Sequence, residues 1–152
     1  MPMDERFYEA PYAYGAHIGW DMEDWREGYS RFRLPAEAHL MNRHGNLHGG
    51  VHASLLDTVM GYAGCWTGDP DRVQLCLTLA LNVQYLSRPR GTVLIAEGRK
   101  TGGGKSTFFA EGEIRDDTGA LIAKGTGTFR YRRCSQITTT SSGGKPLKPT
   151  LE

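Results

Sequence analysis

The sequence predicts an α+β fold in which an antiparallel β-sheet wraps around one central helix. One stretch, which begins at the glycine pair 49–50, places apolar residues three and four apart, the spacing of a buried helix face. The stretches on either side alternate apolar with polar residues and are separated by short turn sequences, which is typical of antiparallel strands. The chain of 152 residues is long enough for one hydrophobic core.

Two strands are expected before the helix and four after it. Residues 15–34 predict a hairpin, and Pro35 closes it. Residues 71–86 give the strongest strand signal, because apolar side chains occupy every second position from Val73 to Tyr85 and mostly polar ones lie between them. Further strands are expected at about residues 92–100, 105–115 and 120–132.

The domain boundaries follow from composition. We expect residues 1–14 to form an irregular or short helical lead and residues 15–132 to form the domain. Residues 133–152 are rich in Ser, Thr, Gly, Pro and Lys and are expected to be a flexible polar tail.

Charge and cysteine content exclude several classes of protein. A net charge of +1 argues against a general nucleic-acid binder. No stretch has the length of a membrane span, and the first residues lack the pattern of a signal peptide, so a cytoplasmic location is the default expectation. The three cysteines have no CxxC spacing, so neither a disulfide framework nor a thiolate zinc site is expected.

The helix start and one carboxylate carry the chemistry that the sequence suggests. Asn42 or Asn46 is expected to cap the helix, while Gly49 and Gly50 leave its first amides open to an anion or a carbonyl oxygen. Asp57 lies further along the same mostly apolar helix, where a carboxylate can activate water or attack a substrate. The segment therefore predicts a site that polarises a carbonyl group beside a base.

Gly49 and Asp57 are too far apart on one helix to act on one carbonyl group. Their separation of eight residues, at about 1.5 Å per residue, amounts to roughly 12 Å along the axis. Two antiparallel copies related by a two-fold axis would bring the helix start of one subunit to the carboxylate of the other, in two symmetric sites. The spacing therefore suggests a dimer.

Two faces of the helix differ in side-chain size. The apolar face is expected to join the core and consists of Val51, Leu55, Val59, Tyr62 and Trp66. The other face is mostly small and consists of Gly50, Ala53, Ser54, Asp57, Gly61 and Gly64. Tight helix packing and a narrow slot for an acyl chain both explain the small face. Likewise, an aryl pocket and the core both explain the large aromatic residues Trp20, Trp25, Tyr62 and Trp66.

Two other motifs resemble known sites but lack essential residues. The sequence Gly-Lys-Ser that contains Lys105 resembles the end of a phosphate-binding loop, yet Arg99 occupies the position of the first glycine and no helix is expected to follow. This basic turn is either ordinary surface or a contact for the phosphate groups of a ligand. His44, His48 and His52 are spaced by four, but no glutamate follows His48, so a zinc hydrolase is not expected.

The combined pattern of residues 42–57 resembles that of hotdog-fold acyl-CoA thioesterases of the phenylacetate-degradation type. The resemblance covers roughly residues 15–131, including the long strand and Pro89 after it. It rests on an asparagine, a glycine, a His-Gly-Gly sequence and an acid nine residues after that histidine, here Asn42, Gly45, His48, Gly49, Gly50 and Asp57.

This resemblance implies a homodimer, often paired again into a dimer of dimers, with active sites between subunits. It assigns the amide of Gly49 to the thioester carbonyl, with Asn42 and His48 beside it. Asp57 and Thr78 would come from the other subunit.

The implied reaction is hydrolysis of an acyl-CoA to a free acid and CoA, with no metal or other cofactor. Asp57 would act as a base or as a nucleophile, and both roles remain open. No nucleic-acid or membrane partner is expected. A hotdog domain that binds acyl-CoA or an aromatic ligand without turnover is the alternative. The expected substrate contacts are Gly50, Ser54, Arg88 and Lys105.

Overall fold

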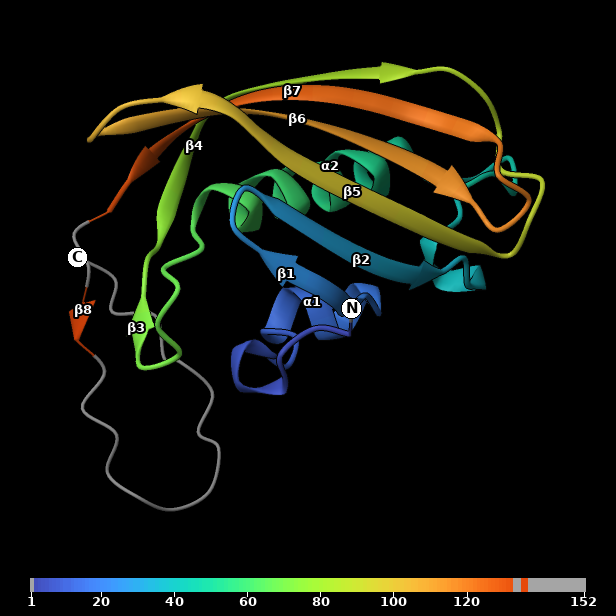
Figure 1. Ribbon diagram of the computed structural model, residues 1–152. Helices are drawn as coiled ribbons and strands as arrows, with labels where there is room; N and C mark the ends of the chain where they lie inside the picture. The colour runs from blue at the N-terminus through green and yellow to red at the C-terminus, as the bar shows by residue number, and fades with distance from the viewer. Residues whose placement is uncertain (1, 133–134, 137–152) are drawn as a thin grey trace.

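A computed structural model describes residues 2–132 and 135–136. Six antiparallel strands form one sheet in the order β1-β2-β5-β6-β7-β4, and the helix α2 (Gly49–Gly64) lies along its concave face (Figure 1). The strands of this sheet are β1 (Asp21–Arg26), β2 (Tyr29–Pro35), β4 (Cys76–Tyr85), β5 (Val93–Gly103), β6 (Thr107–Asp116) and β7 (Leu121–Tyr131). The predicted α+β architecture, an antiparallel sheet around one central helix, is confirmed.

The remaining elements are short. They are the 3-10 turns η1 (Glu5–Phe7) and η2 (Ala38–Leu40), the helix α1 (Ala13–Ile18), and the two-residue strands β3 (Arg72–Val73) and β8 (Ser135–Gln136), which pair with each other. Of the expected polar tail, residues 133–134 and 137–152 lie outside the described residues. No helix in the described part of the chain is both long enough and apolar enough to cross a lipid bilayer.

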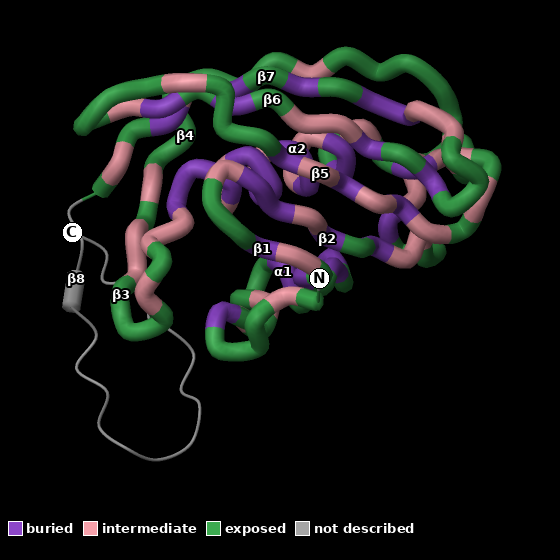
Figure 2. The backbone as a smooth tube through the Cα atoms, in the orientation of Figure 1, coloured by how far each residue is buried: buried purple, intermediate pink, exposed green. Residues whose placement is uncertain are grey.

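The helix α2 packs tightly against the middle of the sheet. Its residues Leu55, Leu56 and Val59 are completely buried, and Figure 2 shows most of the helix as buried. Gly98 of β5 lies so close to the helix that an added Cβ would overlap the carbonyl group of Val59. The Ser30 hydroxyl donates a hydrogen bond of 2.7 Å to that same carbonyl oxygen. Close packing on the sheet therefore fixes the position and rotation of the helix.

The first predicted hairpin begins later than expected. Residues 21–35 form it, with the turn at Glu27 and Gly28, but the first residues of the predicted range belong to α1. Gly19 ends this helix in a left-handed conformation with φ of 103°. Trp20 follows it and is buried against Gly15, so the ring covers this short helix.

The predicted long strand is divided and carries a bulge. Residues 74 and 75 separate β3 from β4, and the register of β4 with β7 shifts between Thr78 and Ala80. Before the bulge, Thr78 lies opposite the core residue Phe129, whereas after it Val83 is the residue that packs on the core. The expectation that all alternate apolar residues share one face was therefore wrong, because the extra residue of a bulge reverses the alternation.

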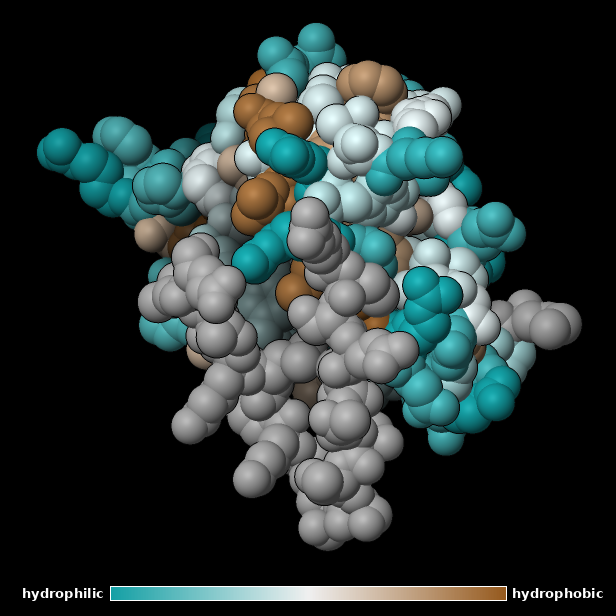
Figure 3. Space-filling model, turned by 90° about the vertical axis from the view of Figure 1, so that its left-hand side faces the viewer, coloured by the Kyte–Doolittle hydropathy of each residue, from teal (hydrophilic) through white to brown (hydrophobic). Residues whose placement is uncertain are grey.

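The strand β4 is an edge of the sheet and exposes several large apolar side chains. Leu77, Leu79 and Tyr85 are each more than half exposed. Figure 3 views the end of the molecule that carries β3 and shows hydrophobic side chains at the surface there. An exposed apolar edge is a common feature of a protein-protein contact.

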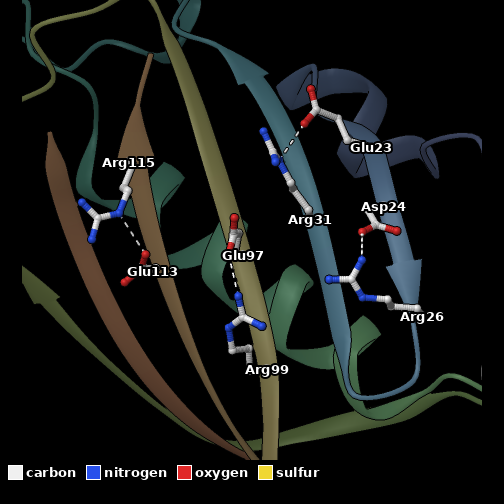
Figure 4. Close-up of polar contacts among 8 residues, drawn as sticks. All are labelled: Glu23, Asp24, Arg26, Arg31, Glu97, Arg99, Glu113 and Arg115. Atoms are coloured by element: carbon white, nitrogen blue, oxygen red, sulfur yellow. Dashed lines mark hydrogen bonds and ion pairs between the residues drawn. The ribbon is translucent and has the colours of Figure 1, made fainter. Parts of the chain in front are cut away.

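The face of the sheet that points away from α2 is charged. Acidic and basic residues on the outer face form ion pairs of 2.6 to 3.0 Å, drawn in Figure 4, between Arg26 and Asp24, Arg31 and Glu23, Arg99 and Glu97, and Arg115 and Glu113. Exposed pairs of this kind contribute at most about 1 kcal/mol each to stability.

Candidate active site

His48, not an asparagine, caps α2. Its imidazole Nδ1 accepts a hydrogen bond of 2.9 Å from the amide of Gly50. The side-chain oxygen of Asn42 instead accepts from the amides of His44 and Asn46, at 2.9 and 3.1 Å, and closes the turn before the helix. The expectation of an asparagine cap was therefore wrong, because this turn uses the oxygen of Asn42 before the helix begins.

The helix start opens onto a cavity of about 680 Å³. The amide of Gly49 lies in the first turn, where an amide has no acceptor within its own helix. Among the described residues, no other oxygen accepts a hydrogen bond from it. The Tyr85 hydroxyl donates to the carbonyl oxygen of Gly49 at 2.7 Å, so β4 forms one wall. Arg88 also lines the cavity, and its guanidinium donates to the side-chain oxygen of Asn46.

Two of the expected substrate contacts have partners within the chain. The amide of Gly50 is bound to His48, as described above. The Ser54 hydroxyl donates to the carbonyl oxygen of Gly50 at 2.8 Å and shares a second hydrogen bond of 2.6 Å with the hydroxyl of Tyr14. A direct role of Gly50 or Ser54 in substrate binding stays a prediction.

Asp57 and Thr78 lie together within one chain. The Thr78 hydroxyl donates a hydrogen bond of 2.6 Å to Oδ1 of Asp57. Among the described residues it is the one donor to this half-buried carboxylate, so the other oxygen remains available. Both residues line a second cavity, of about 200 Å³, between the middle of α2 and the strands β3 and β4. A carboxylate held by one hydroxyl can accept a proton from water or attack a carbonyl carbon.

The second cavity has aromatic walls and a polar group that the sequence did not reveal. Trp25, Tyr62 and Phe129 contribute rings to the lining. Glu9, from the lead before the domain, also lines it, and its Oε2 accepts a hydrogen bond of 2.8 Å from the Tyr62 hydroxyl. Burial raises the pKa of Glu9, although the hydrogen bond from Tyr62 opposes this effect. No spacing or motif places Glu9 near the helix, so only the tertiary structure identifies it.

The other two tryptophans discussed above lie outside this cavity. Trp20 is 1% exposed and belongs to the core. Trp66 follows the end of α2 and stacks against Phe7, with ring centroids 3.9 Å apart. The small face of the helix also serves two purposes, because Gly64 packs against Phe108 whereas Gly61 lines the cavity with Asp57. Tight packing is thus present at Gly64 and a cavity at Gly61, and the use of that cavity by an acyl chain stays a prediction.

Arg88 and Lys105 lie near opposite ends of α2. Arg88 lines the cavity at the helix start. Lys105 lines a separate hollow of about 810 Å³ beside the end of the helix, together with Arg72, Lys100, Arg130 and Arg132. One chain therefore does not bring the two predicted phosphate contacts together.

A metal-binding arrangement is not found in residues 2–132 and 135–136, where no group of three or more His, Cys, Asp or Glu side chains is placed to hold an ion. His52 Nδ1 lies 3.2 Å from the carbonyl oxygen of His48, and His48 itself caps the helix. Cys65 and Cys76 carry free thiols, and Cys134 lies outside the described residues.

Comparisons with known proteins identify relatives of this chain. A family model described as the thioesterase superfamily matches residues 44–123. The conserved protein PA5202 from Pseudomonas aeruginosa is 32% identical, with a TM-score of 0.72 over 86% of this chain and 100% of that one. The BH2602 protein from Bacillus halodurans, solved with CoA, is 33% identical, with a TM-score of 0.59 over 67% of this chain and 66% of that one.

A third structure has the same fold at lower identity. The E. coli PaaI protein, from the phenylacetic acid degradation operon, is 23% identical, with a TM-score of 0.69 over 78% of this chain and 83% of that one. At this identity the similarity concerns the fold alone. The neighbours together confirm the hotdog fold predicted from the sequence.

Proposed function

Because the chain belongs to the thioesterase superfamily, we propose that it is an acyl-CoA thioesterase of the phenylacetate-degradation type. It hydrolyses an acyl-CoA to a free acid and CoA in a site that two copies of the chain share. The observation that carries this proposal is the carboxylate of Asp57, which has one donor among the described residues and lines a cavity between the middle of α2 and the strands β3 and β4. The CoA bound to the Bacillus halodurans neighbour supports a CoA thioester as the substrate.

Two features support a site shared between copies. The open amide of Gly49 and the carboxylate of Asp57 belong to one continuous helix, so roughly 12 Å of axial rise separates them. The exposed edge strand β4 carries the apolar side chains of Leu77 and Leu79, which a second copy would cover. A two-fold axis beside this edge would place the helix start of one copy opposite Asp57 of the other. A further pairing of two such dimers belongs to the same proposal.

In the proposed mechanism the amide of Gly49 donates to the thioester carbonyl oxygen, and this donation stabilises negative charge as the oxyanion forms. His48 orients that helix start through its hydrogen bond to Gly50. Thr78 holds Oδ1 of Asp57, which leaves Oδ2 for one of two roles. As a base, Oδ2 takes a proton from the water that attacks the carbonyl carbon, and the departing CoA thiolate receives that proton. As a nucleophile, Oδ2 attacks the carbonyl carbon and forms a mixed anhydride; water then hydrolyses the anhydride to the free acid and supplies the proton of the CoA thiol. Neither route uses a metal or other cofactor.

A thiol-release assay with a panel of acyl-CoAs tests the proposal. Release of CoA above the uncatalysed rate, abolished by Asp57→Asn, is the expected result. The alternative, a hotdog module that binds acyl-CoA or an aromatic ligand without turnover, predicts saturable binding of acyl-CoA with no thiol release. Binding measured by calorimetry on the same panel separates the two functions.

A further inference from the structure

Two cysteines meet where the helix α2 ends and the strand β4 begins. Cys65 follows the last residue of α2 and Cys76 is the first residue of β4, and both line the cavity that contains Asp57 and Thr78. The Sγ of Cys76 lies 3.5 Å from the place that a Cβ on Gly61 would occupy, and Gly61 lies about one helical turn before Cys65. The two thiols are within hydrogen-bonding reach of each other. They therefore form a dithiol, and neither residue has a role in the proposed hydrolysis.

The two thiols differ in exposure and in acidity. Cys65 is buried, whereas Cys76 is only partly buried. The hydrogen bond from the Cys65 thiol lowers the pKa of Cys76, against the opposing effects of burial and of the Asp57 carboxylate. The same hydrogen bond, together with burial, raises the pKa of Cys65, so Cys65 keeps its proton and acts as the donor. Because the thiolate is the nucleophilic form of a cysteine, Cys76 is the thiol that reacts first.

We propose that Cys65 and Cys76 form an oxidation site, at which a peroxide converts the two thiols to a disulfide and thereby lowers turnover at Asp57. The disulfide itself does not depend on the proposed thioesterase function, whereas its effect on turnover rests on that function. Cys134, which lies outside the described residues, has no part in the inference.

The oxidation takes two steps and consumes one hydrogen peroxide. The Cys76 thiolate attacks one peroxide oxygen and the O–O bond breaks, so Cys76 becomes a sulfenic acid. The departing hydroxide takes up the proton that Cys76 lost and leaves as water. The Cys65 sulfur then attacks the Cys76 sulfur and the S–O bond breaks, so the second hydroxide leaves as water with the proton of Cys65. Each sulfur gives up one electron, and the peroxide accepts both.

A disulfide at this position changes the surroundings of Asp57. Cys76 and Thr78 are two residues apart on β4 and both precede the bulge, so their side chains point to the same side of the sheet. The Thr78 hydroxyl is the group that donates to Asp57 at 2.6 Å. A disulfide holds its two sulfurs about 2.05 Å apart, so it draws the start of β4 towards the end of α2 and moves Thr78 relative to Asp57. A misplacement of about 1 Å can lower the rate of an enzyme by roughly 100-fold.

Mass spectrometry of a Cys134→Ser protein tests the disulfide, because Cys65 and Cys76 are then its only cysteines. After brief treatment with hydrogen peroxide, we expect the intact mass to fall by that of two hydrogen atoms. Trypsin cuts after Arg72, between the two cysteines, so without reduction their two peptides should be recovered as one linked species. A protein that only gains oxygen atoms, or that forms only disulfides between chains, overturns the inference.

Single variants in the same background assign the roles of the two sulfurs. Cys65→Ser leaves Cys76 without a second thiol, so it should gain one oxygen atom and become a sulfenic acid that dimedone traps. Cys65→Ala should do the same and replaces the serine variant if that protein does not fold. Cys76→Ser keeps only the buried thiol and should react roughly 10-fold or more slowly. Equal oxidation rates in the two single variants would contradict the assignment of Cys76 as the reacting thiol.

Turnover before and after oxidation tests the effect on the site. Consumption of acyl-CoA is followed by chromatography, because a thiol reagent would also react with the cysteines. We expect oxidised Cys134→Ser protein to turn over roughly 10-fold or more slowly, and dithiothreitol to restore the rate. The Cys76→Ser variant in that background, treated identically, controls for oxidation elsewhere and should keep its untreated rate. A complete disulfide with an unchanged rate overturns the link to Asp57, whereas no turnover by the reduced protein contradicts the thioesterase function and leaves the disulfide to the mass measurement.

Discussion

Two aspartates, Asp57 on α2 and Asp116 at the end of β6, differ in how their carboxylate oxygens are satisfied. Asp116 is buried, and both of its oxygens accept hydrogen bonds, from the amides of Arg90, Gly91, Thr118 and Ala120 and from the Thr118 hydroxyl. Asp57 accepts from the Thr78 hydroxyl through Oδ1, and its side chain lines a cavity.

The difference separates a structural carboxylate from one suited to chemistry. The donors around Asp116, first among them the Thr118 hydroxyl, lower its pKa and tie the β4–β5 loop to the β6–β7 turn. That carboxylate has no oxygen left for a substrate. Among the described residues, none donates a hydrogen bond to the second oxygen of Asp57. We therefore expect substitution of Asp57 to lower turnover and substitution of Asp116 to lower thermal stability.

The largest expected effect comes from Asp57→Asn. The amide cannot take a proton or attack a carbonyl group, so kcat should fall by roughly 100-fold or more while the protein stays folded. Thiol-release kinetics and thermal melting on the same preparation measure both quantities. Asp71→Asn, on an exposed loop, is the matched control and should match the wild type in both. Near-wild-type turnover of Asp57→Asn would remove this residue from the mechanism.

Complementation tests whether the site is shared. Chains carrying Asn42→Ala and His48→Ala have a defective helix start, and chains carrying Asp57→Asn lack the carboxylate, so each homodimer should be nearly inactive. After mixing and refolding, about half of the dimers are mixed, and each holds one intact and one doubly defective site. Activity should therefore recover to roughly a quarter of wild type.

Differently tagged chains provide the control for that experiment. Recovery of a mixed dimer on sequential affinity columns proves that the two chains exchange. If the mixed dimer forms and its activity equals that of the parents, the site lies within one subunit and the shared-site proposal is wrong.

Thr78→Val tests the hydroxyl that holds Asp57. Valine has the same shape without the donor, so Asp57 loses the one hydrogen bond that it accepts within the described part of the chain, and kcat should fall by roughly 10-fold. Thr78→Ser keeps the hydroxyl and should restore most of the activity. Steady-state kinetics on the wild type and the two variants tests this role. Equal kcat values for Thr78→Val and Thr78→Ser would show that the hydrogen bond has no part in turnover.

The parts of this structure that the sequence predicted are those set by local pattern. The helix and the strands after it follow from periods of 3.6 and 2 in side-chain polarity, which each segment carries by itself. The bulge at Thr78–Ala80 and the position of Glu9 depend on which segments meet in the fold. The cap was misjudged for a related reason, since Asn42 and His48 are both able to accept an amide and only the preceding turn decides between them.

Asp116→Asn is expected to affect stability more than turnover. Its folded-state pKa lies below the unfolded value, so its contribution to stability is fully present above about pH 4 and is lost as the pH falls toward the folded-state pKa. The variant should therefore melt several degrees lower than wild type at pH 7, and this difference should shrink in acid. A kcat as low as that of Asp57→Asn, in a folded Asp116→Asn protein, would undo the distinction between the two carboxylates.

The smallest expected effects concern the cations proposed to meet the phosphates of CoA. Arg88→Met should raise KM for acyl-CoA a few-fold with little change in kcat, because Arg88 is exposed at the cavity of the helix start. Lys105→Met should also raise KM for acyl-CoA if the CoA bound at the shared site reaches the basic hollow at the far end of α2. Both increases should diminish at high ionic strength, since salt screens exposed charges. A pantetheine thioester, which lacks the nucleotide, is the control substrate, and an equal rise in its KM would show that these cations act on some other part of the site.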